Sequence, residues 1–201
     1  MNVPGSTIAR LTGRGLFTRA GAEIGVASTK AFTAQLTNIL LLALFLGKRR
    51  NLSIARFQNI LDNLKTLPHL IEQLLADTQA IQDVAKDLSV YKNFFFLGKH
   101  YHVPIAAEAS LKFKEITYLH SEAYPTGELK HGPLALIDEN IPSILFMPDD
   151  ILFDKNISSL HEIAARKGKI LTISDRQIEA DRSLSIPRTI SELYPFVSVV
   201  V

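Results

Sequence analysis

Residues 91–118 read YKNFFFLGKHYHVPIAAEASLKFKEITY, and their pattern indicates the fold class of the chain. Its first part, residues 91–97, is a short aromatic and apolar run that ends at Gly98, a pattern that predicts a buried β-strand. Residues 104–118 then predict a helix. The stretch therefore reads as a strand followed by a helix.

The same alternation continues toward the C-terminus. Residues 141–147 and 169–173 predict two more strands, and residues 155–167 predict a helix between them. Residues 183–186 predict a further short strand, and residues 196–201 form an apolar run. Strands that alternate with helices are typical of a parallel sheet, so we expect an α/β fold.

The region before residue 89 has a helical pattern instead. A long helix is predicted over residues 29–46 with Ser28 as its N-cap, a second over residues 52–64 that is broken by Pro68, and a third over residues 69–88. The longest uncharged stretch of the chain, residues 31–47, contains several polar side chains and is shorter than the roughly 20 apolar residues of a membrane span. We therefore expect a buried helix of a soluble protein and no membrane partner.

The sequence starts and stops within what look like structured segments. Residues 2–6 look like the end of a strand that enters a turn, and the apolar run at residues 196–201 has no polar cap. We expect the chain to be a fragment of a larger protein.

Composition narrows the class of protein. The chain has 201 residues, of which 47% are hydrophobic and 21% charged, as in ordinary globular domains. A net charge of +2 argues against nucleic acid as a partner. The absence of cysteine excludes thiolate nucleophiles and cysteine-based metal sites, and it fits a reducing compartment.

Three charged residues of the predicted helix share one face. Glu108, Lys112 and Glu115 are spaced four and three residues apart. One interpretation is a solvated face with a Glu–Lys pair that stabilises the helix by about 0.2–0.5 kcal/mol. The other is a lysine and a carboxylate that face a substrate, with Glu108 holding Lys112 in place. A carboxylate whose pKa is raised by burial can move a proton between adjacent carbons.

Two loops carry the other candidate residues. Residues 124–133 contain two glycines, two prolines and His131, whose imidazole suits acid–base chemistry near neutral pH, although an unemployed surface histidine is the alternative. Residues 25–30 place Ser28 and Thr29 at a helix start, which suits an anion or a sugar hydroxyl, or simple helix capping. The histidines lack ligand-like spacing, so we predict no metal site.

Together these stretches resemble one family. The resemblance is carried by NVPGS at residues 2–6, AGAEIGVASTKAF at 20–32, LKFKEI at 111–116, EAY at 122–124 and GELKHGPLAL at 127–136. The chain resembles the isomerase half of the glutamine–fructose-6-phosphate aminotransferases (isomerising), also called glucosamine-6-phosphate synthases. The similarity covers nearly the whole chain.

The resemblance implies a fold and a reaction. Family members have two sugar-isomerase (SIS) subdomains, each a three-layer sandwich with a parallel sheet between helices. Residues 1–88 correspond to the C-terminal part of the first subdomain, a mainly helical remnant, and residues 89–201 to most of the second. The family converts fructose 6-phosphate and glutamine to glucosamine 6-phosphate and glutamate in amino-sugar biosynthesis, without a metal or organic cofactor.

The resemblance also implies residue roles. Glu115 matches the base that moves a proton between C1 and C2 of the sugar, and Lys112 matches the lysine that works beside it. His131 matches the histidine that assists ring opening from the neighbouring subunit of a homodimer. Val26 and Ser28 match positions that touch the sugar. A cytoplasmic transferase with a sugar phosphate as its partner is expected.

Parts of the family's site fall outside the chain. The serine- and threonine-rich phosphate loop would precede residue 1, the lysine that forms a Schiff base with the ketose would follow Val201, and the cysteine-dependent glutaminase is absent. We therefore expect the fragment to be inactive alone. Two alternatives stay open: a non-catalytic SIS-type sugar-phosphate-binding module, and a related sugar-phosphate isomerase or deaminase.

Overall fold

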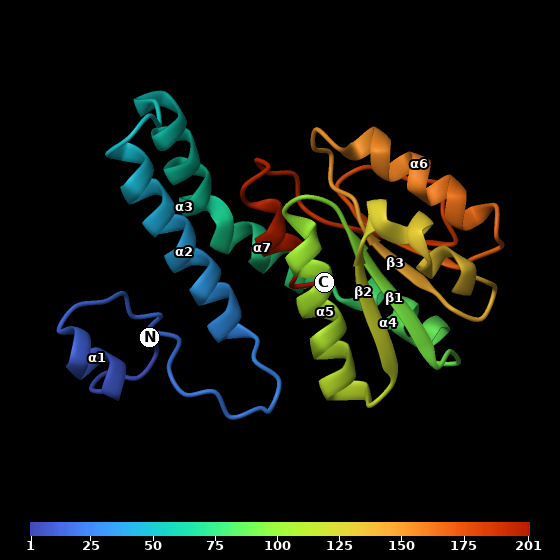
Figure 1. Cartoon of the computed structure of the whole chain (residues 1–201), viewed down its shortest axis with the longest axis horizontal. Coiled ribbons are helices and arrows are strands. Elements are labelled where there is room, and N and C mark those ends of the chain that lie inside the picture. The colour runs from blue at the N-terminus through green and yellow to red at the C-terminus, as the bar shows by residue number, and fades with distance from the viewer. The chain divides into compact units, whose positions relative to one another are not determined.

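A computed structural model describes all of residues 1–201 (Figure 1). The chain forms two compact units, Met1–Asp62 and Asn63–Val201. Only the second contains β-strands.

The first unit is helical. It contains α1 (Thr7–Thr12), α2 (Lys30–Lys48) and the beginning of α3 (Ile54–Ala76). The long predicted helix is confirmed as α2. The predicted cap is wrong: Thr29 is the N-cap and makes no side-chain capping bond, whereas Ser28 donates to Glu23 Oε1 at 3.2 Å.

Glu23 caps α2 from outside the helix. Its Oε1 accepts hydrogen bonds from the backbone N–H groups of Thr29 and Ala31, each at 3.2 Å. Desolvation raises the pKa of the Glu23 carboxyl, but these hydrogen bonds and that from Ser28 outweigh it and leave the pKa below its usual value. A carboxylate at a helix N-terminus is also favoured by the helix dipole.

Helix α2 was predicted to be buried, but most of it is not. Only Ala31 and Leu44 are buried, while Ile39 and Phe45 are more than half exposed. The physical reason is that the first unit offers no sheet to pack against. By length and composition alone, α2 is apolar enough to cross a membrane, a property that core helices of soluble proteins share.

Pro68 does not break the chain into two helices. Helix α3 continues through it from the first unit into the second and ends at Ala76. Pro68 lacks only the N–H that would bond to the Leu64 carbonyl, a loss that a long helix can tolerate. The break comes later, where Asp77 Oδ1 accepts a 2.9 Å hydrogen bond from the Gln79 N–H and α4 (Gln79–Leu88) begins.

The second unit is built on a five-stranded parallel sheet. Its strand order is β2-β1-β3-β4-β5, and every neighbouring pair is parallel. The strands are β1 (Asn93–Gly98), β2 (His120–Pro125), β3 (Ser143–Phe146), β4 (Ile170–Ser174) and β5 (Arg182–Ser185). The predicted α/β fold and four of these strands are confirmed. Strand β2 was not predicted, because its polar and aromatic composition resembles a loop.

Helices cover both faces of the sheet (Figure 1). On one face, Phe95 and Leu97 of β1 join the buried cluster that includes Leu160 of α6 (Phe153–Ala164). On the other, Phe94 and Phe96 pack on Phe113 of α5 (His102–Thr117), with ring centroids 4.6 and 5.5 Å apart. Alternate side chains of a strand point to opposite faces, so β1 anchors both layers.

The turn from β1 into α5 requires a glycine. A Cβ added at Gly98 would lie 2.1 Å from the carbonyl oxygen of His102. No side chain fits there unless the backbone of strand and helix moves apart.

The remaining elements are short. Two 3-10 helices follow β2, namely η1 (Thr126–His131) and η2 (Pro133–Leu136), where a loop was predicted. The apolar C-terminal run contains the buried helix α7 (Tyr194–Ser198). The predicted helix 155–167 is confirmed as α6, displaced by a few residues.

His102 is a buried titratable group in this unit. Its side chain is 1% exposed, and Nε2 lies 3.0 Å from Ser198 Oγ of α7. Burial lowers the pKa of His102 from 6.5 to about 4, and the charge of nearby His100 acts in the same direction. The folded chain therefore holds this imidazole neutral where an unfolded chain would protonate it.

We predict that acid destabilises the fold through His102. Because the folded pKa is depressed, the stabilisation is complete above the unfolded pKa and is lost as the pH falls from about 6.5 toward about 4. Thermal unfolding at pH 7.5 and 5.0 should show a loss of about 2 kcal/mol from this group.

The His102→Gln variant, which can still contact Ser198, should lose most of this pH-dependent difference. His161→Gln, at an exposed position on α6, serves as the control and should keep it. Equal pH dependence in all three proteins would contradict the assignment to His102.

Candidate functional site

Helix α5 carries a compact charged group. Lys112 Nζ lies 2.6 Å from Glu115 Oε2 and 3.8 Å from Glu108 Oε1. The side chains of Lys112, Glu115 and Glu108 are 19%, 29% and 16% exposed, so none is fully solvated. The Glu–Lys pairs are present, as both interpretations of this helix face expect, and all three side chains are partly buried.

The hydrogen bond to Glu115 is the main cause that raises the pKa of Lys112, and the charges of Glu108 and Glu115 act in the same direction against desolvation. Lys112 is therefore held in its charged form between two carboxylates.

An apolar cavity of about 510 Å³ lies beside this group. It opens between α4, α5 and one face of the sheet, and its walls include Val84, Phe96 and Ile116. Lys112 is the only residue lining it that has a charged side chain. An apolar wall lowers the local dielectric and strengthens the interactions of nearby charges.

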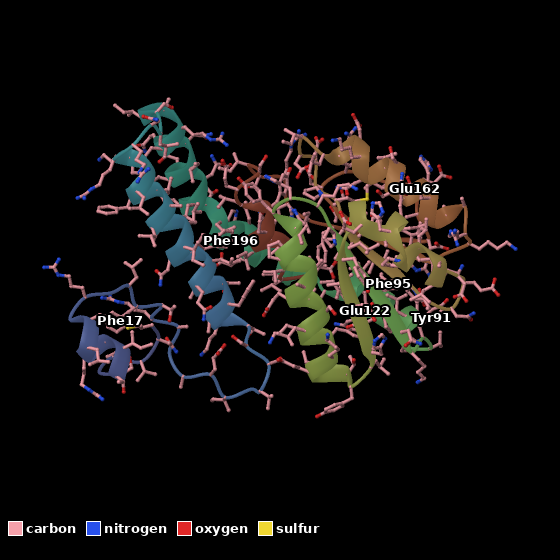
Figure 2. All side chains as sticks on the ribbon, in the orientation of Figure 1. Phe17, Tyr91, Phe95, Glu122, Glu162 and Phe196 are labelled. Carbon is pink, nitrogen blue, oxygen red and sulfur yellow. The ribbon has the colours of Figure 1, made fainter.

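His131 ends η1 on another part of the unit. Its side chain is exposed, while the preceding Leu129 is fully buried in the cluster under α6. Lys130 Nζ forms a 2.7 Å ion pair with Glu162 Oε1 of α6, which Figure 2 labels. The η1 segment is thus fixed on both sides of a histidine that stays accessible.

The topology separates His131 from Glu115 within one chain. Helix α5 follows β1 and leads to its parallel neighbour β2, so it must run back along the sheet. Glu115 lies five residues before β2 starts, at the amino edge of the sheet, and His131 lies six residues after β2 ends, at the carboxyl edge. Six strand residues alone span about 20 Å, so one chain does not bring these two side chains together.

The first unit holds the other two predicted residues. Val26 is 96% exposed, and Ser28 is half-buried and bonded to Glu23. The structure therefore gathers Lys112 and Glu115, keeps His131 at the opposite edge, and places Val26 and Ser28 in a separate unit.

Two polar residues with defined environments, Glu23 and Lys99, were not among the predicted site residues. Glu23 caps α2, and no capping motif at the usual spacing in the sequence predicts this role. Lys99 follows Gly98 directly at the end of β1 and is half-buried. Its position after a strand and a glycine was the available signal. No group of three His, Cys, Asp or Glu residues is arranged to hold a metal ion.

Comparison with known proteins finds a family match within the second unit. Residues 87–182 match the family described as the SIS domain. The whole chain is 41% identical over 206 residues to a glutamine–fructose-6-phosphate aminotransferase (isomerising) of Thermus thermophilus, of which it covers 34%. The enzyme of the same name from Escherichia coli K12 is 46% identical over 175 residues, which are 87% of this chain and 29% of that one.

A solved structure agrees over almost the full length. The C-terminal domain of glucosamine-fructose-6-phosphate aminotransferase from Francisella tularensis has a TM-score of 0.94 and 37% identity. The match covers 99% of this chain and 58% of that one. The chain spans about a third of the length of the curated relatives that it matches.

We predict that Glu115 controls the protonation of Lys112 more than Glu108 does. Glu115→Gln removes the carboxylate at 2.6 Å and should lower the Lys112 pKa, whereas Glu108→Gln removes the one at 3.8 Å and should lower it less. Titration of the lysine ¹³Cε resonances by NMR measures both changes.

Lys114→Gln, at an exposed position on the same helix, is the control and should leave the Lys112 titration unchanged. A larger effect of Glu108→Gln would show that the short Lys112–Glu115 contact does not dominate in solution.

Proposed function

We propose that this chain forms part of a sugar-phosphate site for the conversion of fructose 6-phosphate to glucosamine 6-phosphate. Residues 87–182 match the SIS domain family, and the whole chain matches part of the isomerising aminotransferases. The observation that carries the proposal is the half-buried Lys112–Glu115 pair on α5. Amino-sugar synthesis in the cytoplasm, with glutamine as the nitrogen donor, is part of the same proposal.

In this proposal Glu115 is the base. Its carboxylate takes a proton from C1 of the sugar imine and returns it to C2. The proton of the C1 hydroxyl passes to the imine nitrogen, so that C1 becomes the aldehyde and C2 carries the amino group. Proton transfer at a carbon next to an imine needs a fixed carboxylate within hydrogen-bond reach. The contact with Lys112 supports this role, because it fixes the position of the Glu115 carboxylate.

The other proposed roles are binding and ring opening. Lys112 supplies a fixed positive charge beside the reacting carbons, Val26 and Ser28 contact the sugar, and His131 moves a proton at the ring oxygen. Since one chain keeps His131 and Glu115 at opposite edges of the sheet, we propose that His131 serves the site of a second copy in a homodimer.

The role of Glu115 can be tested in a chimera, in which this chain replaces the matching segment of the Escherichia coli aminotransferase. The Glu115→Gln variant should reduce kcat by about 10²- to 10⁴-fold with little change in KM, because it removes proton transfer and keeps the side-chain shape. Formation of glucosamine 6-phosphate from fructose 6-phosphate and glutamine gives both constants.

Glu139→Gln, an exposed position before β3, is the matched control and should be as active as the parent chimera. If Glu115→Gln keeps full activity, Glu115 is structural, and a non-catalytic sugar-phosphate-binding module becomes the better interpretation of this chain.

The shared site can be tested by mixing two inactive chimeras. In a mixed dimer of Glu115→Gln and His131→Ala chains, one site receives an intact Glu115 from one chain and an intact His131 from the other. Random exchange of subunits should therefore restore about a quarter of the parental activity.

Two residues that act within one chain would leave every site of the mixed dimer defective. No recovery after verified subunit exchange would contradict the shared site. A mixture of two Glu115→Gln preparations controls for reactivation by the exchange procedure.

A further inference from the structure

A second polar cluster lies at the carboxyl edge of the sheet, away from Lys112 and Glu115. Its centre is Lys99, the first residue after β1. Strand order reverses here, because β1 pairs with β2 on one side and with β3 on the other. In open parallel sheets the crevice outside the strands' carboxyl ends, at such a reversal, is the usual place for a ligand.

Lys99 has a half-buried ammonium group without a counterion. Nζ donates a 3.0 Å hydrogen bond to Ser159 Oγ of α6, and no carboxylate lies within 4.0 Å of it. Glu162, whose charge acts on Lys99, forms a 2.7 Å ion pair with Lys130. The charges of two further lysines, Lys130 and Lys155, also act on Lys99, so positive charge outweighs negative charge around it.

The electrostatics of Lys99 agree with this geometry. Desolvation lowers the pKa of Lys99, the carboxylate of Glu162 raises it, and the charges of Lys130 and Lys155 lower it. The net effect is a lowered pKa. A group in this state is stabilised in its charged form by an added anion.

A buried hydroxyl also lies at the same edge. Thr126 is 2% exposed, and its Oγ1 has no hydrogen-bond partner. It directly follows Pro125, which pairs in register with Gly98, the residue before Lys99. The sixteen-residue helix α5 also begins here, so the positive end of its dipole adds to the field of the lysines.

We propose that Lys99, with Lys130, Lys155 and the hydroxyls of Ser159 and Thr126, forms a binding site for a phosphate group. Phosphate carries up to two negative charges and several acceptor oxygens, which match three ammonium groups and two hydroxyls. The group comes either from free phosphate or from a phosphorylated small molecule. The site shares the η1 segment with His131, which has a role in the proposed function, but its test does not depend on Glu115, which lies at the other edge of the sheet.

Calorimetric titration of the 201-residue chain with inorganic phosphate at low ionic strength tests the site. Lys99→Gln should weaken phosphate binding by about tenfold or more, because it removes the charge at the centre of the cluster. Lys86→Gln, an exposed lysine on α4, is the control and should bind as the parent does. No binding to the parent, or equal weakening by both changes, overturns the proposal.

A second measurement needs no variant. Saturating phosphate should raise the pKa of Lys99, followed through the ¹³Cε resonance, and leave that of Lys86 unchanged. An unmoved Lys99 titration overturns the proposal even if Lys99→Gln fails to fold. Lys99→Arg keeps the charge and should keep phosphate binding.

Fructose 6-phosphate and fructose distinguish the sources. Tighter binding of fructose 6-phosphate than of phosphate, lost in Lys99→Gln, assigns the site to a sugar phosphate, and equal affinity assigns it to free phosphate. Binding of fructose with the same affinity as fructose 6-phosphate overturns a phosphate site. Glu115→Gln should bind phosphate normally, so this result stands apart from the outcome for the proposed reaction.

Discussion

The second unit depends on the burial of β1 on both of its faces. Five of its six residues are buried, and its aromatic side chains alternate between the cluster under α6 and the ring of Phe113 on α5. A strand of this kind is stable only between two layers of helices. The crossover from β1 to its parallel neighbour must therefore run back over the sheet as α5, which sets the place of every polar residue discussed above.

The direction of α5 divides the chemistry between two edges. Its first turn lies with Lys99 at the carboxyl ends of the strands, and its last turn carries Glu115 to their amino ends. A single domain thereby presents two separated polar groups of opposite character: a lysine held between carboxylates, and lysines that outnumber their carboxylate. The first suits proton transfer and the second suits an anion. Neither arrangement requires the other.

Much of the fold and part of the candidate site could be predicted, because hydrophobic periodicity can be detected within a short stretch of sequence. The aromatic run of β1 and the stripes of α2 and α6 could be found from sequence, as could the shared face of Lys112 and Glu115. Strand β2 could not be predicted from its sequence, since it forms a strand by pairing with β1. The predicted helix break at Pro68 was wrong because a long helix can tolerate one missing hydrogen bond. The predicted cap of α2 was wrong because the capping carboxylate comes from Glu23, seven positions before the helix. The separation of His131 from Glu115 could be recognised only once the parallel pairing of β1 and β2 was known.

Gly98 lies so close to the backbone of His102 that a substitution at this codon would disturb the fold. Any missense change of a glycine codon introduces at least one carbon atom, and at this position that atom meets the backbone of His102 at 2.1 Å. The strand and helix would have to separate, which would displace both Lys99 and the start of α5. Genetic variation at this codon should therefore damage the carboxyl edge of the sheet, although residue 98 itself carries no reactive group.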